Sequence, residues 1–112
     1  MTTTQTASAQ ITGEVTTWPG VQAGPGARGA FSFTLGRREL GHLHGDRVLH
    51  IGLPKPLWHE LFDAGRIEYH PVFPGKPGFG ARQLASQEDV LDAIALLRLN
   101  YDRIVEGHGL PD

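Results

Sequence analysis

The fold is decided by the stretch from Arg37 to Leu53, which reads RRELGHLHGDRVLHIGL. Residues 37–44 and 48–53 alternate between apolar and polar side chains over much of their length, as half-buried β-strands do. The triplet Gly45-Asp46-Arg47 between them has the composition of a turn. The stretch therefore predicts an antiparallel hairpin with a three-residue connection.

The pairing of the two strands follows from the direction of their side chains. Successive side chains of a strand point to opposite faces, so a three-residue connection places Leu43 opposite Leu49 and His42 opposite His50. A two-residue turn would pair His42 with Leu49 and would mix a polar with an apolar face. We therefore expect one apolar face and one face that carries histidines.

Further strand and helix signals lie on both sides of the hairpin. We expect strands at residues 31–35, 67–73 and 79–84, and helices at residues 54–64 and 86–107. For residues 11–18 the apolar spacing favours a short helix, whereas the threonine-rich composition favours a strand, and we choose the helix. Pro71 places its strand at a sheet edge or at a bulge, and residues 19–29 are expected to form a loop. The element order predicts an α+β fold of two layers, with helices packed on one face of an antiparallel β-meander in the order α-β-β-β-α-β-β-α.

The C-terminal helix has the clearest pattern in the chain. Its apolar side chains recur at steps of three and four residues, at Val90, Ile94, Leu97, Tyr101 and Ile104. Ser86 and Asp89 have the spacing of a capping box, and Gly107 is the expected end. This apolar stripe is expected to pack on the apolar face of the hairpin.

Length and composition predict a single domain. The chain has 112 residues, which is close to the commonest size of one domain. We expect a flexible tail at residues 1–10, which are rich in Thr, Ser, Gln and Ala. The domain is expected at residues 11–107, followed by a short C-terminal tail at residues 108–112.

Charge and hydropathy exclude several classes of function. A net charge of −2 argues against a general nucleic-acid or membrane-surface binder. The absence of cysteine excludes disulfides and thiolate chemistry. No apolar stretch approaches the roughly 20 residues of a membrane span, and the first residues lack the features of a secretory signal. We expect a cytoplasmic protein with no nucleic-acid or membrane partner, and the oligomeric state stays open.

Four of the six histidines lie in the central part of the chain, at His42, His44, His50 and His70. On the expected hairpin the first three share one face, and His70 can join them. Three interpretations fit: a solvated face, a substrate site, or a site for zinc or iron(II), which imidazoles bind. Glu39 lies nearby in the sequence, but in a regular strand its side chain would point to the face opposite that of His42 and His44. It can join the histidines only if the strand contains a bulge.

The segment from Arg38 to His44, followed by Leu49-His50-Ile51, Gly65 and His70-Pro71, resembles the luciferase-type domain typified by fungal luciferase. The resemblance covers residues 31–104. It implies an oxygenase that acts with O₂ on a hydroxylated pyrone-type molecule and needs no metal or organic cofactor; light emission is not part of the expectation. It also implies a polar site made of His42, His44, His50, His70 and Glu39.

The chemistry implied by the resemblance suits histidine. Direct reaction with O₂ requires an electron-rich enol or phenol whose anion forms easily, and histidine, with a pKa of about 6.5, is a suitable base. A second histidine can stabilise the enolate or a peroxide as a hydrogen-bond donor. We expect Trp58, Tyr69, Phe73 and Phe79 to form aromatic walls, and Arg38 to contact an anionic group. The expected partners are a small aromatic or enolic substrate and O₂.

Two other functions remain compatible with the same residues. One is a non-catalytic module of the same fold that binds a small molecule or a protein. The other is a histidine metal-binding protein. A pocket around the histidines favours the enzyme, a flat histidine face favours recognition, and a tight cluster of ring nitrogens favours metal binding.

Overall fold

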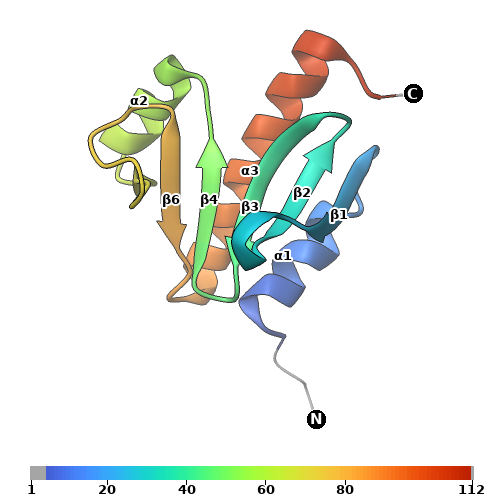
Figure 1. The fold of residues 1–112 in the computed structure, drawn as a ribbon, viewed down its shortest axis with the longest axis horizontal. Coiled ribbons are helices and arrows are strands. Elements are labelled where there is room, and N and C mark those ends of the chain that lie inside the picture. Colours follow the sequence, from blue (N-terminus) through green and yellow to red (C-terminus); the bar gives the residue numbers. More distant parts are fainter. Residues whose placement is uncertain (1–4, 112) are drawn as a thin grey trace.

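The computed structural model describes residues 5–111, which fold into three α-helices and one antiparallel sheet of six strands (Figure 1). The helices are α1 (Ala7–Val15), α2 (Lys55–Asp63) and α3 (Gln87–His108). The strands are β1 (Val21–Pro25), β2 (Phe31–Leu35), β3 (Arg38–His44), β4 (Val48–Gly52), β5 (Glu68–Tyr69) and β6 (Phe79–Gln83), and a short 3-10 helix, η1, covers Ala27–Gly29. The strands lie across the sheet in the order β1-β2-β3-β4-β6-β5.

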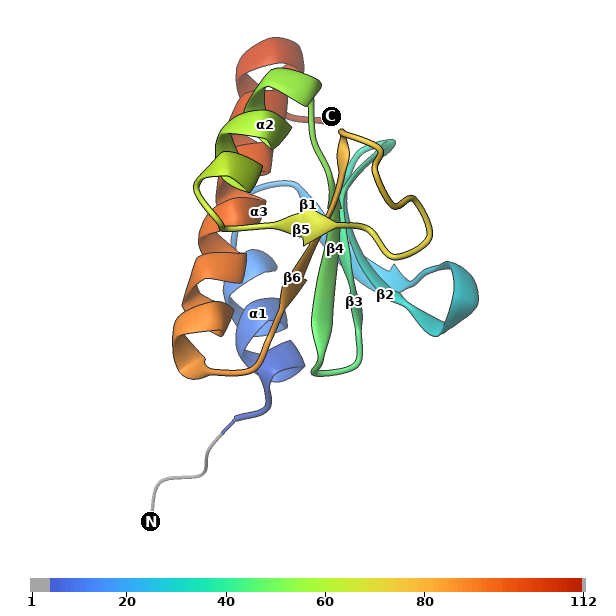
Figure 2. The ribbon, with the colours of Figure 1, turned by 90° about the vertical axis from the view of Figure 1, so that its left-hand side faces the viewer.

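All three α-helices pack on one face of the sheet, which confirms the expected two-layer α+β fold (Figure 2). We call the other side of the sheet the open face. Two connections project from this open face: the η1 segment between β1 and β2, and residues 70–78 between β5 and β6 (Figure 2). The open face is therefore a sheet surface bordered by two loops.

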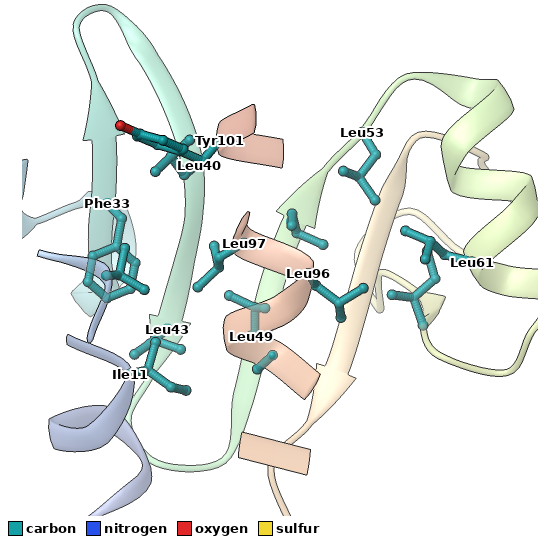
Figure 3. Packing of buried hydrophobic residues seen from close by; sticks show 14 of the residues in the cluster. Ile11, Phe33, Leu40, Leu43, Leu49, Leu53, Leu61, Leu96, Leu97 and Tyr101 are labelled. Atoms are coloured by element: carbon teal, nitrogen blue, oxygen red, sulfur yellow. The ribbon is translucent and has the colours of Figure 1, made fainter. Parts of the chain in front are cut away.

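The core lies between the helices and the sheet (Figure 3). Leu43 of β3 pairs with Leu49 of β4, as their parity predicts, and both are buried. Leu96 and Leu97 of α3 belong to the same buried cluster. Burial of one leucine side chain contributes about 1.5–3 kcal/mol, so these residues determine which side of the hairpin turns toward the helices.

The start of α3 has the predicted capping box. The Asp89 N–H donates to Ser86 Oγ at 3.2 Å, and the Ser86 N–H donates to Asp89 Oδ2 at 3.1 Å. The helix ends later than expected, since it passes Gly107 and reaches His108. The left-handed conformation that commonly follows a helix end occurs at Gly109, where φ is 74°.

Three other segments also differ from the expectation. α1 begins at Ala7 because the Thr6 side chain caps it, so residues 7–10 are helical and not part of a tail, whereas residues 1–4 lie outside the described residues. Residues 21–25 of the expected loop form β1, which pairs with β2 and adds one strand to the expected order. β5 contains only two residues, because Pro71 has no N–H to donate to a longer ladder.

A bulge in β3 changes which side chains reach the open face. Phe33 of β2 pairs with Gly41, whereas the next residue of β2 pairs with Glu39, so Leu40 is one extra residue in β3. Leu40 is fully buried, and a Cβ atom on Gly41 would lie 2.8 Å from Leu97 Cδ2. Two consecutive residues therefore face the helices, and Glu39 lies on the same face as His42.

Candidate functional site

The four histidines meet on the open face, where they form what we call the histidine cluster. His42 pairs with His50 across β3 and β4, in the predicted register, and His44 lies two residues along β3. His70 follows β5 and reaches over the sheet, so that its ring centroid is 4.0 Å from that of His50. The His42 and His44 ring centroids lie 5.2 and 4.7 Å from the His50 ring. His50 is therefore the centre of the cluster.

His50 is buried and electrically neutral at pH 7. Its exposed fraction is 7%, and neither ring nitrogen has a hydrogen-bond partner among residues 5–111. Burial, followed by the charges of His70, His42 and His44, lowers the pKa of His50 to about 4. The centre of the site thus holds two buried ring nitrogens that make no hydrogen bond within the described part of the chain.

Glu39 and His42 form a hydrogen-bonded pair, with 3.1 Å between Glu39 Oε2 and His42 Nδ1. Because an ionised carboxylate only accepts hydrogen bonds, we assign the proton of this contact to Nδ1. The hydrogen bond to His42 lowers the pKa of Glu39. In the neutral ring this arrangement leaves the lone pair of His42 on Nε2.

His70 has the opposite arrangement of its ring nitrogens. The Val72 N–H donates to His70 Nδ1 at 3.1 Å, so the proton of the neutral ring lies on Nε2. Burial, followed by the charges of His42 and His44, lowers the pKa of His70. His70 is therefore a neutral hydrogen-bond donor at pH 7, whereas the neutral form of the His42 ring offers an acceptor on Nε2.

A cavity of about 560 Å³ lies over the histidine cluster. The cluster and Glu39 line it together with the η1 segment, Arg47 and residues 71–73. This volume lies in the usual range for small-molecule pockets. Of the expected aromatic walls, only Phe73 lines it, with its ring centroid 5.3 Å from that of His70.

Comparison with protein-family models shows which family the chain belongs to. The model of the luciferase domain matches residues 37–100, which include the whole histidine cluster and Glu39. The chain belongs to the luciferase-domain family. The resemblance predicted from the spaced histidines is thereby confirmed. Searches among curated proteins and among solved structures found no match.

Three residues expected in the site of this luciferase domain lie elsewhere. Trp58 is buried on the helix side, where its Nε1–H donates to the Phe79 carbonyl oxygen at 2.9 Å. Tyr69 packs against the ring of Phe62 of α2, 4.8 Å between centroids. Arg38 points toward the end of α3, with 3.4 Å between its Nη2 and His108 Nδ1. None of the three lines the cavity of the histidine cluster.

Phe79 lies beside the luciferase-domain site without lining its cavity. Its ring stacks on Phe73, with centroids 4.5 Å apart and an interplanar angle of 28°. Phe73 in turn lies next to His70. Phe79 therefore lies behind Phe73, and of the four expected aromatic residues Phe73 is the one that lines the cavity.

The structure also places two cationic residues at the luciferase-domain cavity that sequence reasoning missed. Arg28 and Arg47 both line it. Arg28 is the only described residue other than glycine with positive φ, at 57°. Such conformations cluster at functional sites, but nothing in the sequence indicates that the η1 loop folds over β3 and β4.

None of the helices in residues 5–111 combines the length and the apolar character that a membrane-spanning helix needs.

Proposed function

We propose that this luciferase domain is a cofactor-independent, histidine-dependent oxygenase that acts on a small aromatic or enolic molecule. The observation that carries the proposal is the Glu39–His42 pair, which lines the cavity together with His50, whose ring nitrogens have no hydrogen-bond partner among residues 5–111. A carboxylate that orients an imidazole is the usual construction of a general base. O₂ is the second substrate.

The first step is removal of a proton from the substrate. His42 Nε2 takes the proton of an enol or phenol hydroxyl, which leaves an electron-rich anion in the cavity. Glu39 holds the Nδ1–H and stabilises the positive charge that the ring gains. His70, which carries its proton on Nε2, donates a hydrogen bond to the substrate oxygen.

The second step is reaction of the substrate anion with O₂. The carbon adjacent to the oxygen-bearing carbon supplies two electrons, so that the C–O⁻ group becomes a carbonyl, a new carbon–oxygen bond forms and O₂ is reduced to a bound peroxide anion. The peroxide takes the proton back from His42, so that substrate and O₂ together give an organic hydroperoxide. The carbon is oxidised, O₂ is reduced, and no proton or electron is left over.

The apolar wall suits a planar substrate. Val72 and Phe73 line the cavity on the side of His70. A ring placed against them excludes water from the reacting carbon, which strengthens the electrostatic contacts of the histidines. Arg28 and Arg47, at the same cavity, favour the anionic form of the bound molecule.

Oxygen consumption tests the proposal directly. The chelator-treated 112-residue protein is mixed with a hydroxylated pyrone or a catechol, and O₂ uptake is followed with an electrode. We expect a rate above that of the buffer, and a loss of 10²- to 10⁴-fold in His42→Ala, as for removal of a general base. Glu39→Gln should also be slow, and His59→Ala, an exposed histidine of α2, should match the unchanged protein.

The same experiment separates an enzyme from a binding module. Ligand binding that depends on His42 without any O₂ uptake would overturn the oxygenase proposal and would support a non-catalytic function of the cavity. Equal O₂ uptake by the unchanged protein and His42→Ala would show that the Glu39–His42 pair is not the base.

A further inference from the structure

We propose that His42, His44 and His50 also form a binding site for one divalent transition-metal ion. Each of the three offers a ring nitrogen, and these atoms all lie within 4.8 Å of one another. The hairpin register places the three residues on two neighbouring strands, so the rigid part of the fold sets their spacing. The family resemblance, by contrast, implies a site without a metal ion.

The observed spacing is close to that of a metal centre. In a tetrahedral zinc site with Zn–N bonds of about 2.0–2.1 Å, the ligand nitrogens lie roughly 3.3 Å apart. The rings of this trio therefore need to close by about 1.5 Å at most. His42 and His44 are half-buried and border the cavity, so rotation of their side chains can supply this movement while buried His50 stays in place.

The contact between Glu39 and His42 is a second, independent observation. Metal-bound histidines commonly donate their other ring N–H to a carboxylate, which fixes the ring and its tautomer. Glu39 Oε2 accepts from His42 Nδ1 at 3.1 Å, and this leaves Nε2 as the ligand atom. His42 is thus held in the form that a metal ion requires.

The unpartnered nitrogens of His50 are a third observation. A buried polar atom without a hydrogen bond costs free energy, and the great majority of such atoms in proteins have a partner. Both ring nitrogens of His50 lack one among the described residues, although the side chain is only 7% exposed. A metal ion bound between the three rings gives one of these nitrogens a ligand bond.

His70 and the cavity complete the surroundings of the ion. The Val72 N–H occupies His70 Nδ1, and the His70 ring lies over His50 on the cavity side. Three imidazoles leave a fourth coordination position of a tetrahedral ion for water or another ligand, and all three histidines line the cavity. Imidazole ligands select Zn²⁺, Cu²⁺, Ni²⁺ or Co²⁺ over Mg²⁺ and Ca²⁺, which prefer oxygen.

Metal binding and the proposed oxygenase use the same atom, His42 Nε2. A bound ion takes the lone pair that would accept the substrate proton, so zinc is expected to inhibit turnover. The existence of the metal site does not rest on the proposed function; only this expected inhibition does.

Metal titration of the full chain tests the site. After treatment with a chelator, Co²⁺ is added while its visible absorption is recorded, and Zn²⁺ binding is measured by calorimetry. We expect one ion per chain, a cobalt spectrum typical of nitrogen ligands in a low-symmetry site, and no heat with Mg²⁺. His44→Gln and His50→Gln should weaken binding at least tenfold, and Glu39→Gln by about 10- to 100-fold.

Matched variants make the test decisive. His59→Ala and His108→Ala remove histidines that lie on α2 and at the end of α3, and they should leave the titration unchanged. Circular dichroism of each variant shows whether it is folded, and a folded His44→Gln protein that binds Zn²⁺ as tightly as the unchanged chain would overturn the site. Absence of binding in the unchanged chain would also overturn it.

Oxygen uptake separates failure of the metal site from failure of the proposed function. Turnover by metal-free protein that falls on addition of one equivalent of Zn²⁺ supports both. Turnover that requires the metal supports the site and overturns the cofactor-independent mechanism. Turnover without any metal binding overturns the site and leaves the oxygenase in place.

Discussion

Glu39 and His42 meet on the open face because β3 contains one extra residue between them. Their contact is 3.1 Å, from Oε2 to Nδ1, although residues three apart in a regular strand lie on opposite faces. The bulge at Leu40 removes this difference in parity. Asn100 of α3 holds the bulge, since its Nδ2–H₂ donates to the Leu40 carbonyl oxygen at 2.9 Å and to that of Gly52 at 3.3 Å.

Asn100→Leu should destabilise the protein and disturb the Glu39–His42 pair. The substitution leaves the buried carbonyl of Leu40 without its partner, which costs about 1–3 kcal/mol. Urea unfolding measures this loss, and the imidazole NMR signals of His42 report any change in its contact with Glu39. Leu99→Ala, at an exposed position next to it in α3, should shift neither. Unchanged His42 signals in folded Asn100→Leu would show that the bulge persists without this contact.

The pKa of His50 should respond to its neighbours in a set order. Proton NMR of the metal-free protein should place the midpoint of His50 at about 4, because burial and the three neighbouring imidazoles all disfavour its charged form. His70→Ala should raise this pKa more than His44→Ala does, since His70 is the largest of the three charge contributions. A His50 that titrates at the ordinary value of 6.5 would contradict the burial of the site.

Stability should fall as the pH is lowered from 6.5 toward 4. In this range the unfolded chain protonates His50, whereas the folded protein does not, so proton binding favours unfolding. His70, whose pKa is also lowered, acts in the same direction. We expect a loss of roughly 1–3 kcal/mol by urea unfolding at a series of pH values. His50→Leu should flatten this dependence, and His59→Ala should keep it.

The acidic groups set the lowest pH at which the unfolding free energy reports mainly on the histidines. Glu39, Asp46 and Asp89 have lowered pKa values, so their stabilising contacts are lost only when the pH falls below the ordinary range of carboxyl groups. Data between pH 6.5 and 5 therefore report mainly the histidines. An equal slope for the unchanged protein and His50→Leu in this interval would assign the effect to other groups.

Ser86→Ala should cost about 1 kcal/mol, because it removes the side-chain acceptor for the Asp89 N–H at the start of α3. Thermal unfolding measures the effect. Ser86→Asp, which restores an acceptor, should recover most of the loss. Neither change should alter the histidine signals, since the cap lies outside the cavity of the cluster. A melting temperature that Ser86→Ala leaves unchanged would mean that the cap contributes nothing to stability.

The sequence alone determined the central hairpin and the long C-terminal helix. The pairing of His42 with His50 followed from parity and from a three-residue connection, both of which are local properties. The start of α3 at Ser86 followed from hydrogen bonds between residues three apart. Local patterns of this kind also predicted that three histidines share one face. The spacing of the histidines predicted the luciferase-domain family, which the family model confirms.

Only the tertiary structure decided which side chains share the site. The bulge that brings Glu39 to His42 is held by a contact between residues 60 positions apart, and no local pattern in β3 specifies it. Trp58 and Tyr69 lie on the helix side of the sheet because α2 packs there. Arg28 lines the cavity because the η1 loop folds over the open face. These positions depend on packing between distant segments, because the free energy that fixes them comes from contacts that form only when the layers assemble.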